Sequence, residues 1–562
     1  MIHHARTWRA GFLVAAVLVV AALVLAACGT STSSTSSSST ASATGNPGQP
    51  KSGGTINYPI QSEPGGIAAW TIYESEGFEV GHQVLEGLTQ YVLQPDGSMK
   101  TVPNIAQSWS SPDGKVRTFH LKHGVMFQPP VSREVTAQDF VDSWNFNTNP
   151  KLGDNYTAYI LAPVVGTDAS GYRTGKTLGV KALDRYTLQV TLKYPFYDFP
   201  VTMGHPVATV EPVDYINKVG VKNFAAKPIG TGPFMVESWV HNQYVDLVRN
   251  PDWWQKATTK GPYVDKVHFP IYLDTNTEWL DFQKGTIDFS MVPPGEVTAA
   301  LNNASVKNGT WSAKKWPNLG IYYININQKD PLLGGAKGLP LRQALSYSAD
   351  TSAIINVINQ GVGLTPNGLV PTGIAGSQLS QLPYPFDQAK AKALISKMGT
   401  VPTLNYWFNT DLGHQKIAEA LQAGWKQVGI NVKLSNFEWN TFNKLQRSAS
   451  KGDQLSRSGW LADYPTMDDF LYPLYYSAQS GLNGYSFYNN PQVDQLLNQA
   501  RGTADETQRL QLDAQAEKLI LADAASIPIY FYQNFRVWNS TRVANLVMDP
   551  LQEVNMWQLW IK

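Results

Sequence analysis

The stretch PTLNYWFNTDLGHQKIAEALQAGWKQVGINVKL, residues 402–434, decides the class of fold. It begins with a short run of β-forming residues at 404–408. Apolar residues then recur at helical spacing, at Ile417, Leu421, Trp425 and Val428. Gly429 can end that helix in a left-handed conformation, and residues 430–434 alternate as a strand. This order predicts a βαβ crossover, with two parallel strands in a sheet that helices cover.

Two other segments extend this prediction. Residues 187–192 alternate strictly between apolar and polar side chains, which is typical of a half-exposed strand. Thr136 and Asp139 precede apolar residues at helical spacing, so Thr136 can accept from a free backbone N–H while Asp139 sits favourably in the first turn. We therefore expect an α/β fold with an antiparallel portion.

The first residues have the pattern of an export signal. Arg6 and Arg9 precede an uncharged run over 10–27, and LAAC ends at Cys28, the only cysteine in the chain. LAAC resembles the bacterial lipobox, whose cysteine receives a diacylglycerol and becomes the new N-terminus. We predict a signal peptide over 1–27, lipidated Cys28, and a flexible Ser/Thr-rich tether over 28–52. A plain signal peptide and a single membrane span are the alternatives.

Charge and composition narrow the choice of partner. Removal of residues 1–27 takes away two of the 44 basic residues, which leaves 42 beside 43 acidic ones. A nearly neutral chain gives no support for a nucleic acid or an anionic membrane surface as partner. Because Cys28 is committed to lipid, we expect no disulfide, and an apolar core must supply stability. The remaining length, roughly 510 residues, predicts about three domains.

Motifs for catalysis and metal binding are weak. GxSxG, CxxC and HExxH are absent, and GYRTGKT at 171–177 is one residue short of a phosphate loop. His120 and His123 are three apart in a predicted strand, where they face opposite sides and make a poor metal pair. Asp468 and Asp469 are adjacent, so we expect their side chains to diverge. We predict no enzymatic activity, no cofactor and no metal.

Nine segments, in one order, resemble the oligopeptide- and dipeptide-binding family, the extracytoplasmic solute-binding proteins of ATP-binding-cassette peptide importers. The strongest is 228–254, which contains PIGTGPF, ESW and VRNPDWW. The other segments are 104–145, 179–195, 284–288, 341–350, 428–434, 459–464, 489–497 and 525–534. In PIGTGPF, Gly230 and Gly232 allow unusual backbone angles or a close approach, so we interpret them as structural.

The resemblance covers residues 53–562 and implies a two-lobe fold of the type II periplasmic-binding-protein kind, with a hinge. Lobe I would comprise 53–88, 212–318 and 533–562. An α+β domain, 89–211, would be inserted into lobe I, and lobe II would be 319–532. A ligand would lie between the lobes and favour closure only as far as it binds the closed state better.

The resemblance also implies ligand-binding residues. Asp463, in GWLADY, matches the aspartate that holds the ammonium group of a peptide, for which a carboxylate in a dry cleft is well suited. A turn-capping role before Pro465 is the alternative. The other candidates are aromatic walls, arginines that could meet a peptide carboxylate, and a glutamate of the first lobe: Trp460, Tyr464, Trp439, Arg457, Arg447 and Glu63. Core positions for the tryptophans and a solvated position for Arg447 are the alternatives.

The function that this resemblance implies is capture of short peptides at the extracytoplasmic face of the bacterial cell membrane. The protein would be a lipid-anchored monomer that delivers peptides to a permease driven by cytoplasmic ATPases. It would touch the membrane only through its lipid, and no nucleic acid. Residues 466–469 and 128–130 depart from the family pattern, and family members also bind nickel complexes, sugars, opines and haem. An oligosaccharide ligand, a surface-anchored hydrolase and a sensor or adhesin remain as alternatives.

Overall fold

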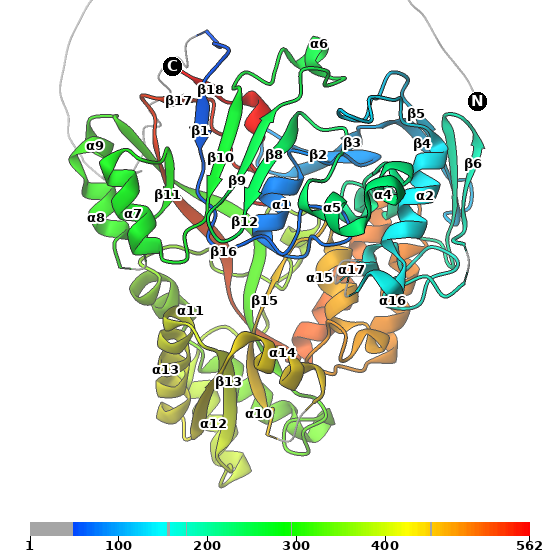
Figure 1. Cartoon of the computed structure of the whole chain (residues 1–562). Coiled ribbons are helices and arrows are strands. Elements are labelled where there is room, and N and C mark those ends of the chain that lie inside the picture. Colours follow the sequence, from blue (N-terminus) through cyan, green and yellow to red (C-terminus); the bar gives the residue numbers. More distant parts are fainter. Residues whose placement is uncertain (1–48, 154, 156–157, 176, 294, 450–451) are drawn as a thin grey trace, which may run out of the picture. The chain divides into compact units, whose positions relative to one another are not determined.

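The computed structural model describes residues 49–562, apart from residues 154, 156, 157, 176, 294, 450 and 451 (Figure 1). The predicted signal peptide, Cys28 and nearly all of the tether therefore lie outside the described residues. Among the residues that are described, no helix is both long and apolar enough to cross a membrane.

The described residues form five sheets. A four-stranded sheet has the order β1 (Thr55–Asn57), β10 (Lys266–Pro270), β9 (Tyr244–Arg249), β8 (Phe234–Val240). A six-stranded sheet has the order β11 (Phe289–Met291), β16 (Ser526–Asn539), β12 (Trp311–Ile326), β15 (Leu455–Leu461), β13 (Leu404–Asn409), β14 (Val432–Phe437). A second four-stranded sheet has the order β4 (Ala106–Ser110), β5 (Val116–Leu121), β7 (Thr187–Thr191), β6 (Val180–Asp184). Two pairs complete the set: β2 (Thr89–Leu93) with β3 (Met99–Pro103), and β17 (Val543–Ala544) with β18 (Trp560–Ile561).

The helices that matter below are α1 (Ser75–Gly81), α2 (Ala137–Asn147), α10 (Gly335–Tyr347), α12 (Gln388–Met398), α13 (Leu412–Gln427), α14 (Trp439–Arg447), α15 (Met467–Tyr475), α16 (Pro491–Arg501) and α17 (Glu506–Ala522). Shorter or peripheral helices are α3 (Phe199–Thr202), α4 (Val213–Val219), α5 (Val221–Ala226), α6 (Lys256–Thr259), α7 (Thr275–Lys284), α8 (Val297–Asn302), α9 (Ala304–Lys307) and α11 (Thr351–Ala353).

The predicted βαβ crossover is confirmed. Strands β13 and β14 pair in parallel, with Leu404 opposite Val432, and α13 connects them. Helix α13 begins after Asp411, whose carboxylate accepts the backbone N–H of His414 at 3.0 Å. Gly429 adopts the expected left-handed conformation, with φ of 94°. The apolar face of α13 is buried against the sheet, as its spacing required.

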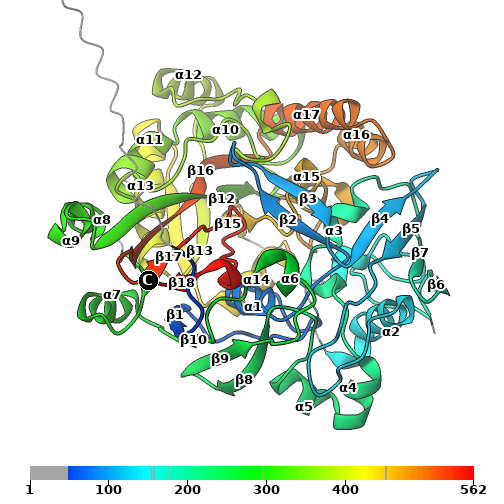
Figure 2. The ribbon, with the colours of Figure 1, turned by 90° about the horizontal axis from the view of Figure 1, so that it is seen from above.

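Helices cover both faces of the six-stranded sheet (Figure 1, Figure 2). One face packs against α10, α12 and α13 in a cluster that includes the fully buried Trp425. The other face packs against α15, α16 and α17. Each large side chain buried in this way contributes roughly 1.5–3 kcal/mol, so two covered faces hold the strand ends that carry the site in place.

Two long strands, β12 and β16, run from the part of the sheet beside β11 to the part beside β15. They pair antiparallel from Trp311 opposite Asn539 to Asn325 opposite Ser526, and the pairing shifts register between Pro317 and Ile321. The predicted lobe boundaries, 318/319 and 532/533, fall inside these strands and beside that shift. A hinge at this place stays a prediction.

The β4–β7 sheet is antiparallel throughout, as expected for part of the fold. Its strand β7 confirms the alternation seen at residues 187–192. Helix α2 packs on this sheet (Figure 2), and its N-cap is the predicted one: Asp139 accepts the backbone N–H of Thr136 at 2.8 Å.

The PIGTGPF segment needs its glycines because the chain passes very close to residues 83–84. A Cβ atom on Gly230 would lie 2.1 Å from the carbonyl oxygen of Val84, and one on Gly232 would lie 2.7 Å from that of Gln83. Neither contact is possible for a larger residue without displacing the backbone, so the structural interpretation of both glycines is confirmed.

Candidate functional site

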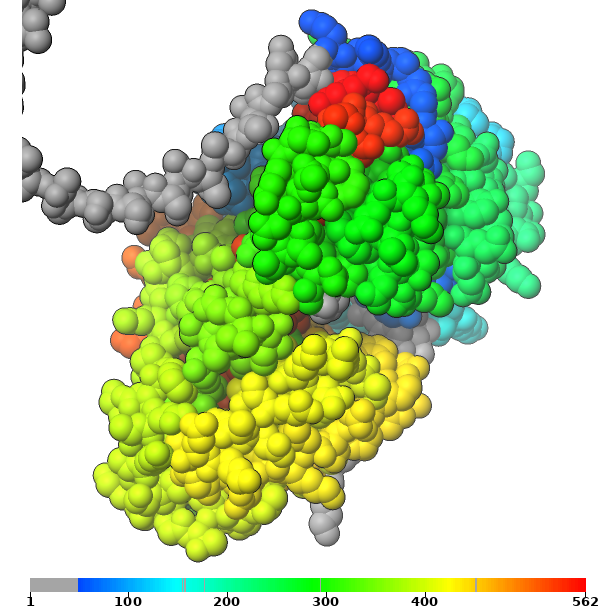
Figure 3. All heavy atoms as spheres, turned by 90° about the vertical axis from the view of Figure 1, so that its left-hand side faces the viewer, coloured from blue at the N-terminus to red at the C-terminus, as the bar shows by residue number. Residues whose placement is uncertain are grey.

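A cleft of about 1100 Å³ lies beside the carboxyl end of β15. One side, which we call the α1 wall, is formed by residues 73–82 and 551–553. The other, the α14–β15 wall, is formed by residues between 439 and 463. Figure 3 shows the molecule hollowed between the segment coloured green, near residue 300, and the segment coloured yellow, near residue 430.

Asp463 lies in the cleft at the end of β15, and the chain around it is fixed by Asp469. The Asp469 Oδ2 atom accepts the backbone N–H of Asp463 at 3.1 Å and the indole N–H of Trp460 at 3.0 Å. The Asp463 carboxylate accepts the hydroxyl of Tyr159. Its side chain is 20% exposed, so it is largely withdrawn from water yet open to the cleft.

Histidine 205 does not neutralise this carboxylate. Its Nδ1 atom accepts the backbone N–H of Val207 at 3.2 Å, so a neutral ring carries its proton on Nε2, which lies 3.9 Å from Asp463 Oδ1. Burial lowers the pKa of His205 to about 3, and the ring is therefore uncharged at neutral pH. No described lysine or arginine forms an ion pair with Asp463.

Asp463 and Asp469 are thus two neighbouring, largely buried carboxyl groups that form no ion pair with a lysine or arginine among the described residues. Burial raises the pKa of Asp463 to about 6, against the effect of the Tyr159 hydrogen bond. Burial, and then the charge of Asp463, raise the pKa of Asp469 well above its ordinary value. A cation in the cleft would relieve both effects, because it would favour the ionised carboxylates. These two carboxyl groups can accept a cationic group.

Arg457 is a half-buried cation on β15, six residues before Asp463 in the chain. Its guanidinium lies over the ring of Tyr322, 5.1 Å from the centroid, and donates to Asn409 Oδ1 at 3.3 Å and to the Tyr532 hydroxyl at 3.4 Å. Its Nε has no partner among the described residues, and no described carboxylate pairs with it. Arg457 can therefore meet an anionic group that enters the cleft.

The structure brings five of the seven candidate residues together. The cleft is lined by Asp463, Trp460, Trp439, Arg457 and Arg447. Trp439, the first residue of α14, is 51% exposed and so is not a core residue. Glu63 is not among the cleft-lining residues; its carboxylate accepts from the indole of Trp239 at 2.9 Å and the backbone of Asn242 at 2.7 Å.

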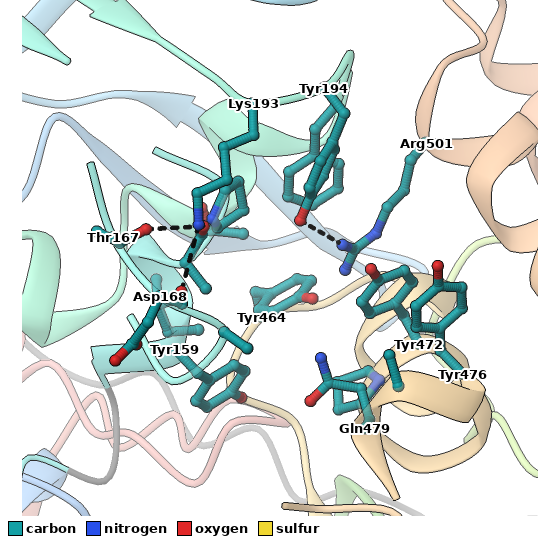
Figure 4. A pocket seen from close by; sticks show the side chains of 18 residues that line it. Tyr159, Thr167, Asp168, Lys193, Tyr194, Tyr464, Tyr472, Tyr476, Gln479 and Arg501 are labelled. Atoms are coloured by element: carbon teal, nitrogen blue, oxygen red, sulfur yellow. Dashed lines mark hydrogen bonds between the residues drawn. The ribbon is translucent and has the colours of Figure 1, made fainter. Parts of the chain in front are cut away.

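Tyr464 faces a second, smaller cavity of about 380 Å³ (Figure 4). Its hydroxyl donates to Asp468 Oδ2 at 2.8 Å, and Arg501 binds the same carboxylate through Nε at 2.6 Å and Nη2 at 2.7 Å. Arg501 extends between Tyr194 and Tyr472 in Figure 4. Tyr159 lines both cavities, so it lies between the smaller one and the cleft that contains Asp463.

Sequence reasoning missed Tyr159, His205 and Asp469. The first two lie about 300 and 260 residues before Asp463 in the chain, and their own segments carry no motif that marks them. Asp469 could be seen only as half of an adjacent pair whose side chains diverge, which the structure confirms. Among the described residues, no group of three or more His, Cys, Asp or Glu side chains could hold a metal ion.

Residues 100–481 match the family model described as bacterial extracellular solute-binding proteins, family 5 Middle. The chain belongs to this family. The periplasmic oligopeptide-binding protein OppA of Escherichia coli is 30% identical over 496 residues, which cover 86% of this chain and 88% of OppA. OppA of Bacillus subtilis is 29% identical over 494 residues, which cover 85% and 87% of the two chains. Family 5 proteins are extracytoplasmic solute-binding proteins and not enzymes, in agreement with the sequence prediction.

Solved family 5 structures share the fold. Haemophilus influenzae OppA in complex with RPPGFSPFR matches with a TM-score of 0.74 and 25% identity, over 91% of this chain and 100% of that one. The Escherichia coli murein tripeptide binding protein MppA matches with a TM-score of 0.73 and 26% identity, over 91% and 99%. The predicted α/β, type II periplasmic-binding-protein fold is therefore confirmed. Other relatives are named for haem and, as probable, for deoxycholate.

Proposed function

We propose that this chain captures short peptides outside the cytoplasmic membrane and delivers them to the permease of an ATP-driven importer. It is held at the membrane by a lipid on Cys28 and performs no chemistry on its ligand. The lobes are 53–88 with 212–318 and 533–562, and 319–532, with 89–211 as the inserted domain. Closure proceeds about β12 and β16.

The observation that carries this proposal is Asp463, a largely buried carboxylate with no cationic partner among the described residues. The free ammonium group of a peptide supplies the missing charge, and the Tyr159 hydroxyl and Asp469 hold the carboxylate in position. Arg457 meets an anionic group of the ligand, such as its C-terminal carboxylate. An uncharged sugar would leave both groups without a counterion, which is costly in a dry cleft.

The relatives support the same class of ligand. The structures of similar fold include OppA bound to RPPGFSPFR and a murein tripeptide-binding protein. Trp439 and Trp460 add apolar walls that can accept varied side chains without specific polar demands.

A calorimetric titration tests the proposal. The protein is first unfolded and refolded to remove carried-over ligand, and then titrated with alanine peptides of two to five residues, and in parallel with maltotriose, haem and deoxycholate. We expect saturable binding of at least one peptide at one site per chain. Binding of one of the other ligands with no binding of any peptide would overturn the proposal.

A further inference from the structure

The two walls of the cleft carry opposite charge. Among the described residues that line the α1 wall, none is a lysine or arginine, and four are glutamates: Glu74, Glu76, Glu79 and Glu553. The described residues that line the α14–β15 wall instead include Lys444, Arg447 and Arg457, and Asp463 is the only acid among them. A ligand in the cleft therefore experiences an acidic and a basic side.

Two of the four glutamates already have partners inside the wall. Glu74 caps α1: its carboxylate accepts the backbone N–H groups of Gly65 at 2.7 Å and Gly77 at 3.1 Å. Glu553 pairs with His82, and although burial lowers the pKa of that imidazole, the charge of Glu553 raises it overall. Glu74 is thus engaged through Oε1, although its Oε2 has no partner among the described residues, and Glu553 is engaged through His82.

Glu76 and Glu79 are not engaged in this way. They stand three residues apart on α1 and so share one helical face. Glu79 is 6% exposed, lines the cleft, and has no partner for its Oε2 atom among the described residues. Burial raises the pKa of Glu79 to about 8; the nearby charge of Arg536 acts against this rise, and the charge of Glu76 adds to it. Neither glutamate forms an ion pair with a described residue, so this buried carboxyl group and its neighbour can accept a cationic group from the cleft.

This pair of glutamates adjoins the proposed ammonium site at Asp463. The ring of Phe78, which lies between Glu76 and Glu79 in the chain, packs edge-on against the ring of His205 with 5.2 Å between centroids. His205 Nε2 in turn lies 3.9 Å from Asp463. Tyr91 lies close to both regions. Its pKa is raised mainly by burial, and further by the charges of Glu553 in the α1 wall and of Asp469 and Asp463 on the other side. An extended peptide advances at most about 3.5 Å per residue, so the side chains nearest the α1 glutamates are those that follow the N-terminus.

We propose that the cleft selects peptides with a lysine or arginine in the first or second position, and that Glu76 and Glu79 are the specificity-determining residues. This inference rests on the peptide-binding function proposed above. The α-ammonium group occupies Asp463, and the basic side chain extends to the α1 wall. The basic α14–β15 wall repels the same side chain when it points toward α14 and β15. The peptide therefore binds with its basic side chain toward the α1 wall.

The test compares peptides that differ only in one charge. The refolded protein is titrated with Lys-Ala-Ala, Ala-Lys-Ala, the same two peptides with norleucine in place of lysine, and Ala-Ala-Ala, at physiological salt. Norleucine keeps the apolar stem and removes the ammonium group. We expect at least one lysine peptide to bind about tenfold more tightly than its norleucine counterpart, as for a partly buried charge-assisted hydrogen bond.

Variants assign the effect to the two glutamates. In the double variant Glu76→Gln with Glu79→Gln, the preference for lysine over norleucine should fall to about twofold or less. Glu506→Gln, an exposed glutamate of α17 outside the cleft, serves as the matched control and should keep the preference. The single variant Glu76→Gln, at a partly exposed position, gives the same readout should the double variant fail to fold.

Three outcomes overturn the inference. Equal binding of lysine and norleucine peptides, with Ala-Ala-Ala also bound, would remove the selectivity and leave the peptide-binding function intact. A lysine preference that survives in the glutamine variants would assign it to other residues. Failure of every peptide to bind would overturn the proposed function, and this inference with it.

Discussion

Replacement of Asp463 by asparagine should weaken peptide binding and at the same time stabilise the ligand-free protein. Asparagine keeps the size of the side chain and an oxygen for the Tyr159 hydroxyl, but it cannot be ionised. The loss of a desolvated partner for the ligand ammonium should cost at least about 2 kcal/mol, or roughly 30-fold in affinity.

The gain in stability follows from the pKa of the carboxyl group. Burial raises the pKa of Asp463 from its ordinary 3.8 to about 6, and the side chain is 20% exposed. The unfolded chain ionises near pH 4 and the folded protein only near pH 6, so the folded state loses stability as the pH rises through this interval. A shift of about two units corresponds to roughly 3 kcal/mol at pH 7, which the asparagine variant should recover in large part.

Two assays read these effects on the same samples. Isothermal titration with a free-amine tripeptide gives the affinity, and urea unfolding of ligand-free protein at pH 7 and pH 4 gives the free energy of unfolding. The stability difference between variant and wild type should be large at pH 7 and small at pH 4. Asp252→Asn, at an exposed position, should change neither quantity. A variant that binds peptide normally, or that is less stable than wild type at pH 7, would refute the reasoning.

Three further predictions concern pH and the packing that supports the site. Peptide affinity should fall about tenfold between pH 7 and pH 5, since Asp463 with a pKa of about 6 must be ionised to bind, and the Asp463→Asn variant should lack this dependence; a flat wild-type profile would contradict the assignment. Arg501→Met should lower the free energy of unfolding by about 3–5 kcal/mol, because it leaves Asp468 buried without its partner, and an effect below about 1 kcal/mol in urea unfolding would be inconsistent with this. Gly230→Ala should destabilise the protein by at least about 1–3 kcal/mol through its clash with Val84, whereas Gly502→Ala, whose Cβ would lie 3.5 Å from the nearest atom, should be nearly neutral in the same unfolding assay.

The sequence predicts the fold well where the signal is local. The βαβ crossover at 402–434 follows from helical and strand periodicity, and the cap at Thr136 follows from the spacing of two polar residues. The sequence indicates that the backbone approaches another segment closely at Gly230. It does not indicate that this segment contains Val84, because the two residues lie about 145 positions apart in the chain. Resemblance to a family supplied what periodicity could not, namely the type of fold.

The candidate site could be predicted only in part. The family motif marked Asp463, Trp460 and Arg457 as candidates, and the structure places all three at the cleft. Tyr159 and His205 could not be found, because burial and hydrogen bonding across the fold give them their roles. The charge of the α1 wall is visible in the sequence as three glutamates at 74–79, but which of them lack partners depends on the packing.

The most direct test of the central claim is the effect of N-terminal acetylation on binding. Wild-type protein, freed of carried-over ligand, is titrated with one tripeptide and with its N-acetylated form, which has the same side chains and no ammonium group. The account predicts saturable binding of the free peptide and at least about 30-fold weaker binding of the acetylated one, with no such difference in the Asp463→Asn variant. Equal binding of both peptides by the wild type would contradict the pairing of Asp463 with the ligand ammonium.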